Sequence, residues 1–136
     1  MKFYIATSLS NWKSHNKVRD ALIAFEHEIA YDWTLHGSVK SVSKGRLRDV
    51  AIQELQGVSE ADFLIVLLPG GHGTHLELGF GIAHQKQIFL HTEDPRLFEL
   101  GPQTNAFYHH PDVTCLSCSL DDLPLLVNDY LCGVES

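Results

Sequence analysis

One apolar segment constrains the fold of this chain more than any other feature. The six residues from Phe63 to Leu68 are all apolar, and Pro69, Gly70 and Gly71 follow them at once. A short apolar run closed by turn-forming residues is typical of a strand that is buried on both faces of a sheet. A membrane helix needs roughly 20 apolar residues. The segment therefore predicts a central buried strand and no membrane span.

Shorter apolar segments alternate with helical patterns on both sides of this strand. Further strands are expected at residues 2–7, 29–33, 87–91 and 113–116. Four helices are expected between and after these strands. Three of them are marked by apolar residues at helical spacing: Val18, Leu22, Phe25 and Ile29 in the first, Leu47, Val50, Ala51, Leu55 and Val58 in the second, and Leu120, Leu123, Leu126, Val127 and Tyr130 in the last. The third covers residues 74–84, and Ser119 is the expected N-cap of the last. This order predicts an α/β fold, a doubly wound, flavodoxin- or Rossmann-like parallel sheet of about five strands with helices on both faces. Residues 1–136 are expected to form a single domain.

Charge and cysteine content narrow the possible partners. The 136 residues include 10 Lys and Arg against 17 Asp and Glu, which gives a net charge of −7. Such a chain is not expected to bind a nucleic-acid polymer, because that binding depends on lysine and arginine. The N-terminus has no signal-peptide core, and three cysteines form no disulfide framework. We therefore expect a cytoplasmic protein with free thiols and no membrane contact.

The segment from Pro69 to Gly79 carries the clearest chemical signal. Gly70, Gly71, His72, Gly73 and Thr74 join the central strand to the next helix. Glycines let backbone N–H groups approach a ligand, and a helix N-terminus favours anions. The segment has neither the lysine of a P-loop nor the position of a dinucleotide fingerprint. It predicts a site for a small anion.

Two glutamates allow both structural and catalytic interpretations. Glu77 could complete a capping box with Thr74 as N-cap, or act as a nucleophile kept ionised in the first helical turn. Both can hold at once. Glu54 falls among the apolar positions of the helix expected over residues 46–59, so it is either a buried acid or an edge residue that reaches solvent. Trp12 and Trp33 either stack on a base or pack at loop edges.

Three segments carry a resemblance to a known family. Residues 2–6, 61–66 and 73–79 resemble the nucleoside 2-deoxyribosyltransferase family, which includes deoxynucleoside 5′-monophosphate N-glycosidases. The resemblance implies that Glu77 attacks C1′ of the sugar and that Tyr4 positions it. It also implies that Glu54, at a place usually held by aspartate, handles the leaving base. The function implied is cleavage or transfer at an N-glycosidic bond through a covalent glycosyl-glutamate, with no cofactor or metal.

The same resemblance bears on substrate and assembly. At the position of Gly71, the nucleoside-transferring members of the family have an aspartate that binds the 5′-hydroxyl. The monophosphate glycosidases have a serine suited to phosphate. Gly71 matches neither, so a substrate with a 5′-hydroxyl and one with a 5′-phosphate both remain possible. Asn105 and Phe107 align with residues that complete the pocket, the asparagine coming from a neighbouring subunit. Gly79, Gly81 and Ala83 indicate close packing of a helix against the sheet or a second copy. We expect a homodimer or higher oligomer that binds a small nucleoside or nucleotide.

Three alternatives remain open from the sequence. Residues 69–77 also resemble the signature of the Lonely Guy phosphoribohydrolases, which cleave the same kind of bond. A non-catalytic nucleotide sensor could use the same glycine loop. Finally, His75 and Glu77 with Cys115 and Cys118 resemble the spacing of zinc-dependent nucleobase deaminases.

Overall fold

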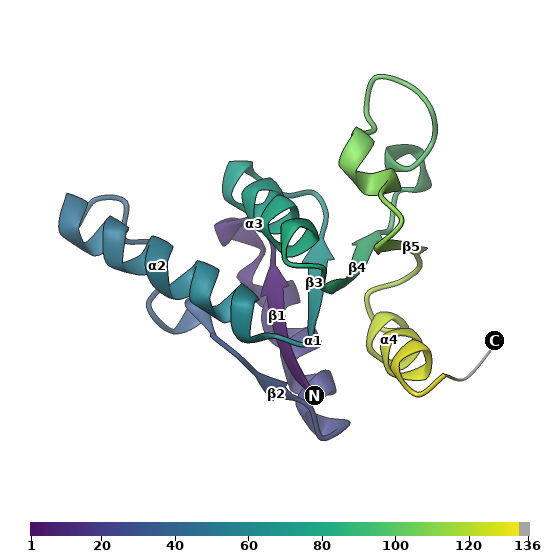
Figure 1. The fold of residues 1–136 in the computed structure, drawn as a ribbon, viewed down its shortest axis with the longest axis horizontal. Coiled ribbons are helices and arrows are strands. Elements are labelled where there is room, and N and C mark those ends of the chain that lie inside the picture. The colour runs from purple at the N-terminus through teal and green to yellow at the C-terminus, as the bar shows by residue number, and fades with distance from the viewer. Residues whose placement is uncertain (134–136) are drawn as a thin grey trace.

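The computed structural model, which describes residues 1–133, is an α/β fold built on one parallel sheet (Figure 1). Its five strands lie in the order β2-β1-β3-β4-β5, and every neighbouring pair is parallel. The strands are β1 (Lys2–Ala6), β2 (Glu28–Ile29), β3 (Phe63–Leu67), β4 (Gln87–Thr92) and β5 (Val113–Ser117), and the α-helices are α1 (Trp12–Ala24), α2 (Lys44–Glu60), α3 (His72–Ala83) and α4 (Leu123–Leu131). The doubly wound, flavodoxin-like sheet predicted from the sequence is confirmed.

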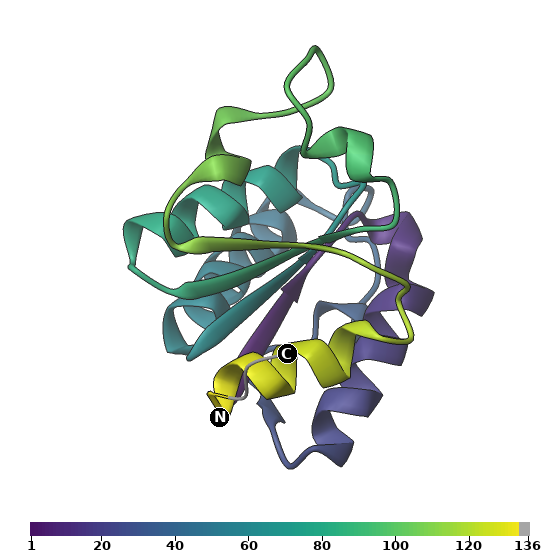
Figure 2. The ribbon, with the colours of Figure 1, turned by 90° about the vertical axis from the view of Figure 1, so that its right-hand side faces the viewer.

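Alternate residues of the strands form two cores. Tyr4, Leu64 and Val66 point to the face covered by α2 and α3. Phe3, Ile65 and their neighbours point to the face covered by α1 and α4. Figures 1 and 2 show the two helix pairs on opposite sides of the sheet. The central strand β3 is buried throughout, because both of its faces are covered.

The strand order places a ligand crevice at one end of the sheet. The chain leaves β1 toward β2 on one side and leaves β3 toward β4 on the other, so the winding reverses between β1 and β3. Open α/β sheets bind ligands beyond the carboxyl ends of their strands at such a point. The segment between β4 and β5, with the short 3₁₀ helices Pro95–Leu97 and Ala106–His109, extends beyond this end of the sheet (Figure 1).

The expected element boundaries differ from the structure at the second strand and at the closing helix. The second strand is only Glu28–Ile29, and Trp33 begins a 3₁₀ helix, where its indole N–H donates to the Ile5 carbonyl at 2.9 Å. Ser119 is not the N-cap of the closing helix. Asp122 holds that place, and the Ser119 hydroxyl instead accepts the Asp122 N–H at 3.2 Å. Pro124 near the start of α4 suits this later beginning, since a first-turn residue needs no N–H donor.

The glycines of α3 have different surroundings. A Cβ at Gly81 would lie 2.8 Å from Leu64 Cδ2, so this glycine lets the helix pack closely on β3. A Cβ at Gly79 would meet no atom within 4 Å. Close packing on the sheet therefore explains Gly81 and not Gly79. In the part of the chain described, no helix is long and apolar enough to cross a membrane.

Candidate active site

A cavity of about 650 Å³ opens at the carboxyl ends of β1 and β3, on the face covered by α2 and α3. Thr7 follows β1, Glu54 comes from α2, and residues 71–74 and Glu77 come from the start of α3. Apolar side chains, Trp33 among them, and polar ones such as His36 and Lys40 complete the wall. We call this space the carboxylate cavity, because Glu54 and Glu77 both line it.

Glu77 lies in the second turn of α3 and not in its first. The helix begins at His72 with Gly71 as its N-cap, two residues earlier than the sequence predicts. The Thr74–Glu77 capping box is therefore wrong: the Thr74 hydroxyl accepts the Gly71 N–H at 3.2 Å, and Glu77 takes no part. Glu77 is 7% exposed. Since the helix dipole acts mainly within the first turn, burial and not the dipole decides its charge.

Burial raises the pKa of Glu77 from 4.5 to about 8. The nearby Tyr4 hydroxyl lowers this pKa in part, and the negative charge of Glu54 raises it further. The expectation that the helix holds Glu77 ionised is therefore wrong, since burial favours the protonated carboxyl at neutral pH.

Tyr4 and Glu77 both have buried polar atoms without partners. Glu77 Oε2 and the Tyr4 hydroxyl are enclosed, and no hydrogen bond of regular geometry satisfies either atom among the described residues. Burial, together with the charges of Glu77 and Glu54, raises the pKa of Tyr4 well above its ordinary value. Tyr4 therefore remains a neutral phenol whose O–H can donate to an ionised Glu77. Unsatisfied buried polar groups are uncommon and concentrate where a ligand or reaction uses them.

Gly57 of α2 is a positioning residue that sequence reasoning missed. A Cβ at this position would lie 2.6 Å from Tyr31 Cβ and 3.1 Å from the Tyr4 ring. Only glycine lets α2 approach Tyr31 this closely, and Tyr4 of β1 packs beside the same position. A glycine in the middle of a helix costs roughly 0.5–1 kcal/mol relative to alanine. A glycine at this unfavourable position was the signal in the sequence that could have indicated close packing at Gly57.

Glu54 is partly buried and lines the carboxylate cavity, so its catalytic interpretation has the required geometry. Burial raises its pKa, while the nearby His36 ring lowers it in part. His36 Nδ1 lies 2.7 Å from the Gly37 carbonyl oxygen, which can only accept, so Nδ1 carries the hydrogen. The loop residue His36 was not singled out from the sequence, because only the fold brings it to the cavity.

The glycine loop contributes Gly71, His72, Gly73 and Thr74 to the cavity wall, as expected, but Gly70 does not line it. A Cβ on Gly70 would lie 2.4 Å from Thr74 Cγ2, so Gly70 makes room for Thr74 and not for a ligand. Gly71 and Gly73 have open space around them. The N–H groups of the first helical turn have no acceptor within α3 and are available to an anion.

His75 connects the glycine loop to the segment between β4 and β5. Its Nδ1 lies 2.8 Å from the Gly71 carbonyl oxygen and its Nε2 lies 2.7 Å from the Tyr108 hydroxyl. Both ring nitrogens are therefore engaged. Within residues 1–133, no three His, Cys, Asp or Glu side chains gather in an arrangement that could hold a metal ion. The deaminase-like spacing thus has no matching cluster in the fold.

Asn105 and Phe107 lie away from the carboxylate cavity of their own chain. Asn105 is the N-cap of the 3₁₀ helix Ala106–His109 and accepts the Phe107 N–H at 2.8 Å. Phe107 is 59% exposed. Neither residue lines the cavity. Trp12 is also exposed and outside it, whereas Trp33 is buried in its wall.

Comparisons with known proteins define the fold further. The chain superposes on a 2-deoxyribosyltransferase from Bacillus psychrosaccharolyticus with a TM-score of 0.70 and 18% identity, over 91% of this chain and 90% of that one. It superposes on the CMP N-glycosidase BcmB of Clostridium botulinum with a TM-score of 0.60 and 16% identity, over 94% and 98%. No family model matches the sequence. No curated protein matches it either. The fold is thus the one found in these two enzymes.

Proposed function

We propose that this protein cleaves or transfers at the N-glycosidic bond of a nucleoside or nucleoside 5′-monophosphate through a covalent glycosyl ester on Glu77. The observation that carries the proposal is the buried Glu77 carboxyl, which faces one cavity together with Glu54 at the winding reversal of the sheet. The resemblance of residues 2–6, 61–66 and 73–79 to the nucleoside 2-deoxyribosyltransferase family supports it. The fold shared with a deoxyribosyltransferase and a CMP N-glycosidase agrees.

In the first step, the ionised Glu77 attacks C1′ of the sugar. The C1′–O bond forms as the C1′–N bond breaks, and the electron pair of that bond goes to the base. The base takes a proton from the Glu54 carboxyl, whose raised pKa favours the protonated form. Tyr4 stays protonated and orients Glu77 from behind.

In the second step, water or an acceptor base attacks C1′ and releases Glu77. Glu54, now ionised, takes the proton of the attacking group, so both carboxyls return to their starting states. The reaction needs a charge on Glu77 and a proton on Glu54. Burial raises the pKa of both carboxyls, and that of Glu77, the more deeply buried of the two, rises to about 8. The two groups titrate as a pair.

The substrate's 5′ end would lie against the first turn of α3. His72, Gly73 and Thr74 offer backbone N–H groups, and Lys40 is the one lysine or arginine among the described residues that line the cavity. Backbone donors and one ammonium group suit a phosphate even in a chain of net charge −7. Gly70 would act by admitting Thr74 to its place.

Asn105 and Phe107 would contribute to substrate binding from a second subunit. Both lie outside the cavity of their own chain, and Phe107 is exposed. A homodimer in which the segment between β4 and β5 reaches the neighbour's cavity would bring them to the base. Sedimentation as a monomer at micromolar concentration would contradict this part of the proposal.

One assay tests the proposal. The protein is incubated with ribo- and deoxynucleosides and their 5′-monophosphates, with and without an acceptor base, and free base and exchanged product are measured. Wild type should release or exchange base, and Glu77→Ala should lose at least about a thousandfold in rate. Glu99→Gln, an exposed site, is the matched control. Equal base release by Glu77→Ala and wild type would disprove the mechanism. Binding without turnover would favour the nucleotide sensor.

A second comparison tests the proposed contact between Lys40 and the 5′-phosphate of the substrate. Lys40→Gln should raise KM for 5′-monophosphates by roughly tenfold, as expected for a lost charge-assisted contact, and leave nucleosides unaffected. Lys44→Gln is the control, since Lys44 is exposed on α2 and does not line the cavity. Equal KM changes for both substrate types would argue against a phosphate contact.

A further inference from the structure

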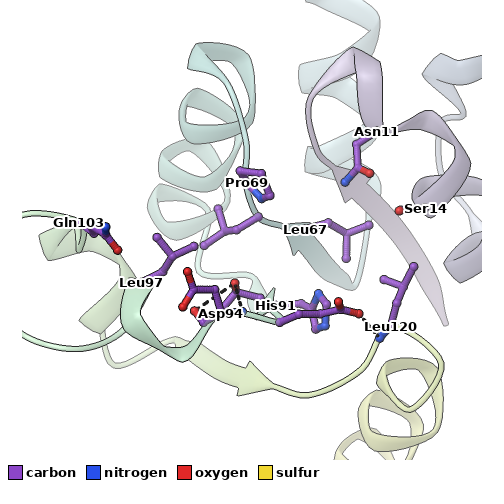
Figure 3. A pocket seen from close by; sticks show the side chains of 12 residues that line it. Asn11, Ser14, Leu67, Pro69, His91, Asp94, Leu97, Gln103 and Leu120 are labelled. Atoms are coloured by element: carbon purple, nitrogen blue, oxygen red, sulfur yellow. Dashed lines mark hydrogen bonds between the residues drawn. The ribbon is translucent and has the colours of Figure 1, made fainter.

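A second cavity lies near the same end of the sheet, on the face covered by α1 and α4. It has a volume of about 500 Å³ and is drawn in Figure 3. Asn11 and Ser14 lie on one side of it, Asp94, Leu97 and Gln103 on the other, and His91 of β4 lies between them (Figure 3). We call it the His91 cavity. The two cavities are neighbours, since Asn11 Nδ2 donates to Thr7 Oγ1 at 3.0 Å and Thr7 lines the carboxylate cavity.

His91 presents an unused acceptor to this space. The side chain is 3% exposed, and its Nε2 lies 2.8 Å from the Cys118 carbonyl oxygen. A carbonyl oxygen only accepts, so Nε2 carries the hydrogen and Nδ1 of the neutral ring carries a lone pair. Nδ1 has no hydrogen-bond partner among the described residues, and protein atoms do not enclose it completely. The lone pair is therefore reached from the cavity.

Asn11 and Glu93 present further acceptors to the cavity, while Ser14 and Gln103 can both donate and accept. Asn11 uses its amide nitrogen on Thr7, which leaves Oδ1 free. Glu93 accepts the Leu120 N–H at 3.0 Å through Oε1, which leaves Oε2 free.

Charge in the His91 cavity favours a cation. Asp94 is neutralised by Arg96, whose guanidinium donates to both carboxylate oxygens at 2.9 Å. Within residues 1–133 no cation pairs with Glu93, which therefore brings a negative charge to the rim. None of the described residues that line the cavity is a lysine or arginine, so an anion finds no counter-charge there. Apolar side chains form much of the remaining wall: Leu67, Leu68, Pro69, Leu97 and Leu120.

We propose that the His91 cavity is a second small-molecule site, which binds an organic amine with an apolar body. The ammonium group lies between Glu93 and His91 Nδ1 and donates to both, and the body packs on the leucines and Pro69. A buried acceptor that gains a donor recovers the cost of its desolvation. This site is separate from the carboxylate cavity and does not depend on the reaction proposed there.

Binding of benzylamine tests the proposal without any turnover. Benzylamine combines an ammonium group with an apolar ring, and benzyl alcohol and benzoate are matched neutral and anionic probes. Amide resonances are followed by ¹H–¹⁵N NMR during titration. Benzylamine should shift residues 11–14, 91–94 and 120 with a dissociation constant of roughly 1–10 mM, ordinary for so small a ligand. The two other probes should bind at least about fivefold more weakly.

Two variants locate the contact. Glu93→Gln keeps an acceptor for the Leu120 N–H but removes the charge, and His91→Gln keeps a donor for the Cys118 carbonyl but removes the second nitrogen. Each should weaken benzylamine by about fivefold or more, while the exposed control Glu99→Gln should not. The same spectra report whether each variant is folded. Unchanged affinity in both variants, equal binding of benzoate, or shifts confined to Glu54 and Glu77 would overturn the proposal.

Discussion

Two carboxyl groups of this molecule, Asp32 and Glu77, have pKa values shifted in opposite directions. Asp32 is partly buried, whereas Glu77 is buried. Burial raises the pKa of Asp32, but hydrogen bonds from Thr34 and Arg19 outweigh it and leave the pKa below its ordinary value. For Glu77, burial dominates and the pKa rises to about 8. Hydrogen-bond partners, together with the depth of burial, therefore decide the direction in which the pKa of each carboxyl shifts.

The surroundings explain the difference. Arg19 donates to Asp32 Oδ2 at 2.8 Å and the Thr34 N–H donates to Oδ1 at 3.0 Å, so this group fixes the chain beside Trp33. Glu77 has the Tyr4 hydroxyl nearby but no cation beside it among the described residues, and its Oε2 is enclosed without a partner. Sites that do chemistry commonly retain groups that cost stability. Four predictions use this contrast, from the largest expected effect to the smallest.

Glu77→Gln should stabilise the protein increasingly as pH rises from 5 to 9. Unfolded Glu77 ionises near 4.5 and folded Glu77 near 8, so wild type loses stability through this group as pH rises between these values. At about 1.4 kcal/mol per unit the shift corresponds to an upper limit of roughly 5 kcal/mol. We expect a gain of at least about 2 kcal/mol at pH 9 and little at pH 5, measured by urea unfolding. A gain independent of pH would contradict the assignment.

Asp32→Asn should destabilise the protein, in contrast to Glu77→Gln. Removing the charge leaves the partly buried Arg19 with only the exposed Asp20 as counter-ion, and breaking a buried ion pair is strongly destabilising. Because Arg19 is 20% exposed and water reaches it, we expect a loss of about 2 kcal/mol at pH 7 in the same unfolding measurement. Asp20→Asn is the control, since Asp20 also pairs with Arg19 but is exposed. Equal losses in both variants would show that burial of Asp32 contributes nothing.

The pH profile of kcat/KM tests the pairing of Glu77 with Glu54. Wild type needs one proton on the pair, so the profile should be bell-shaped, with a loss of about tenfold per pH unit above the upper pKa near 8. Glu54→Gln cannot lose that proton. The kcat/KM of this variant should be lower than that of wild type, should rise with pH as Glu77 ionises, and should then stay constant at higher pH. An alkaline fall that survives in Glu54→Gln would remove Glu54 from the role of acid.

Tyr4→Phe should leave stability unchanged or raise it by up to about 1 kcal/mol, because the Tyr4 hydroxyl is buried without a partner. Thr34→Val, which removes a hydroxyl that donates to Asp32, should instead cost about 1 kcal/mol. Thermal unfolding at pH 7 compares the two. If Tyr4→Phe is the more destabilising, the Tyr4 hydroxyl has a structural partner after all.

The fold was predictable because its main signals are local. Apolar strands and helical spacing predicted all five strands and all four helices, with β3 the clearest. The errors fall at the ends of elements. The helix expected to start at Thr74 starts at His72, because Gly71 serves as N-cap and Thr74 turns back to bond it. Several N-cap choices compete within a few residues, and only the packed loop selects one.

The sequence by itself determined the sheet, its winding, and the elements that carry Tyr4, Glu54 and Glu77, because periodicity and turn residues act within short stretches of chain. Tertiary structure alone decided which polar groups keep a partner. Asp32 and Glu77 look alike as acids in a sequence, yet one meets Arg19 and the other an enclosed space. Likewise, His36, Gly57 and the His91 cavity depend on segments far apart in the chain. Charge state follows from such neighbours, and neighbours exist only once the chain has folded.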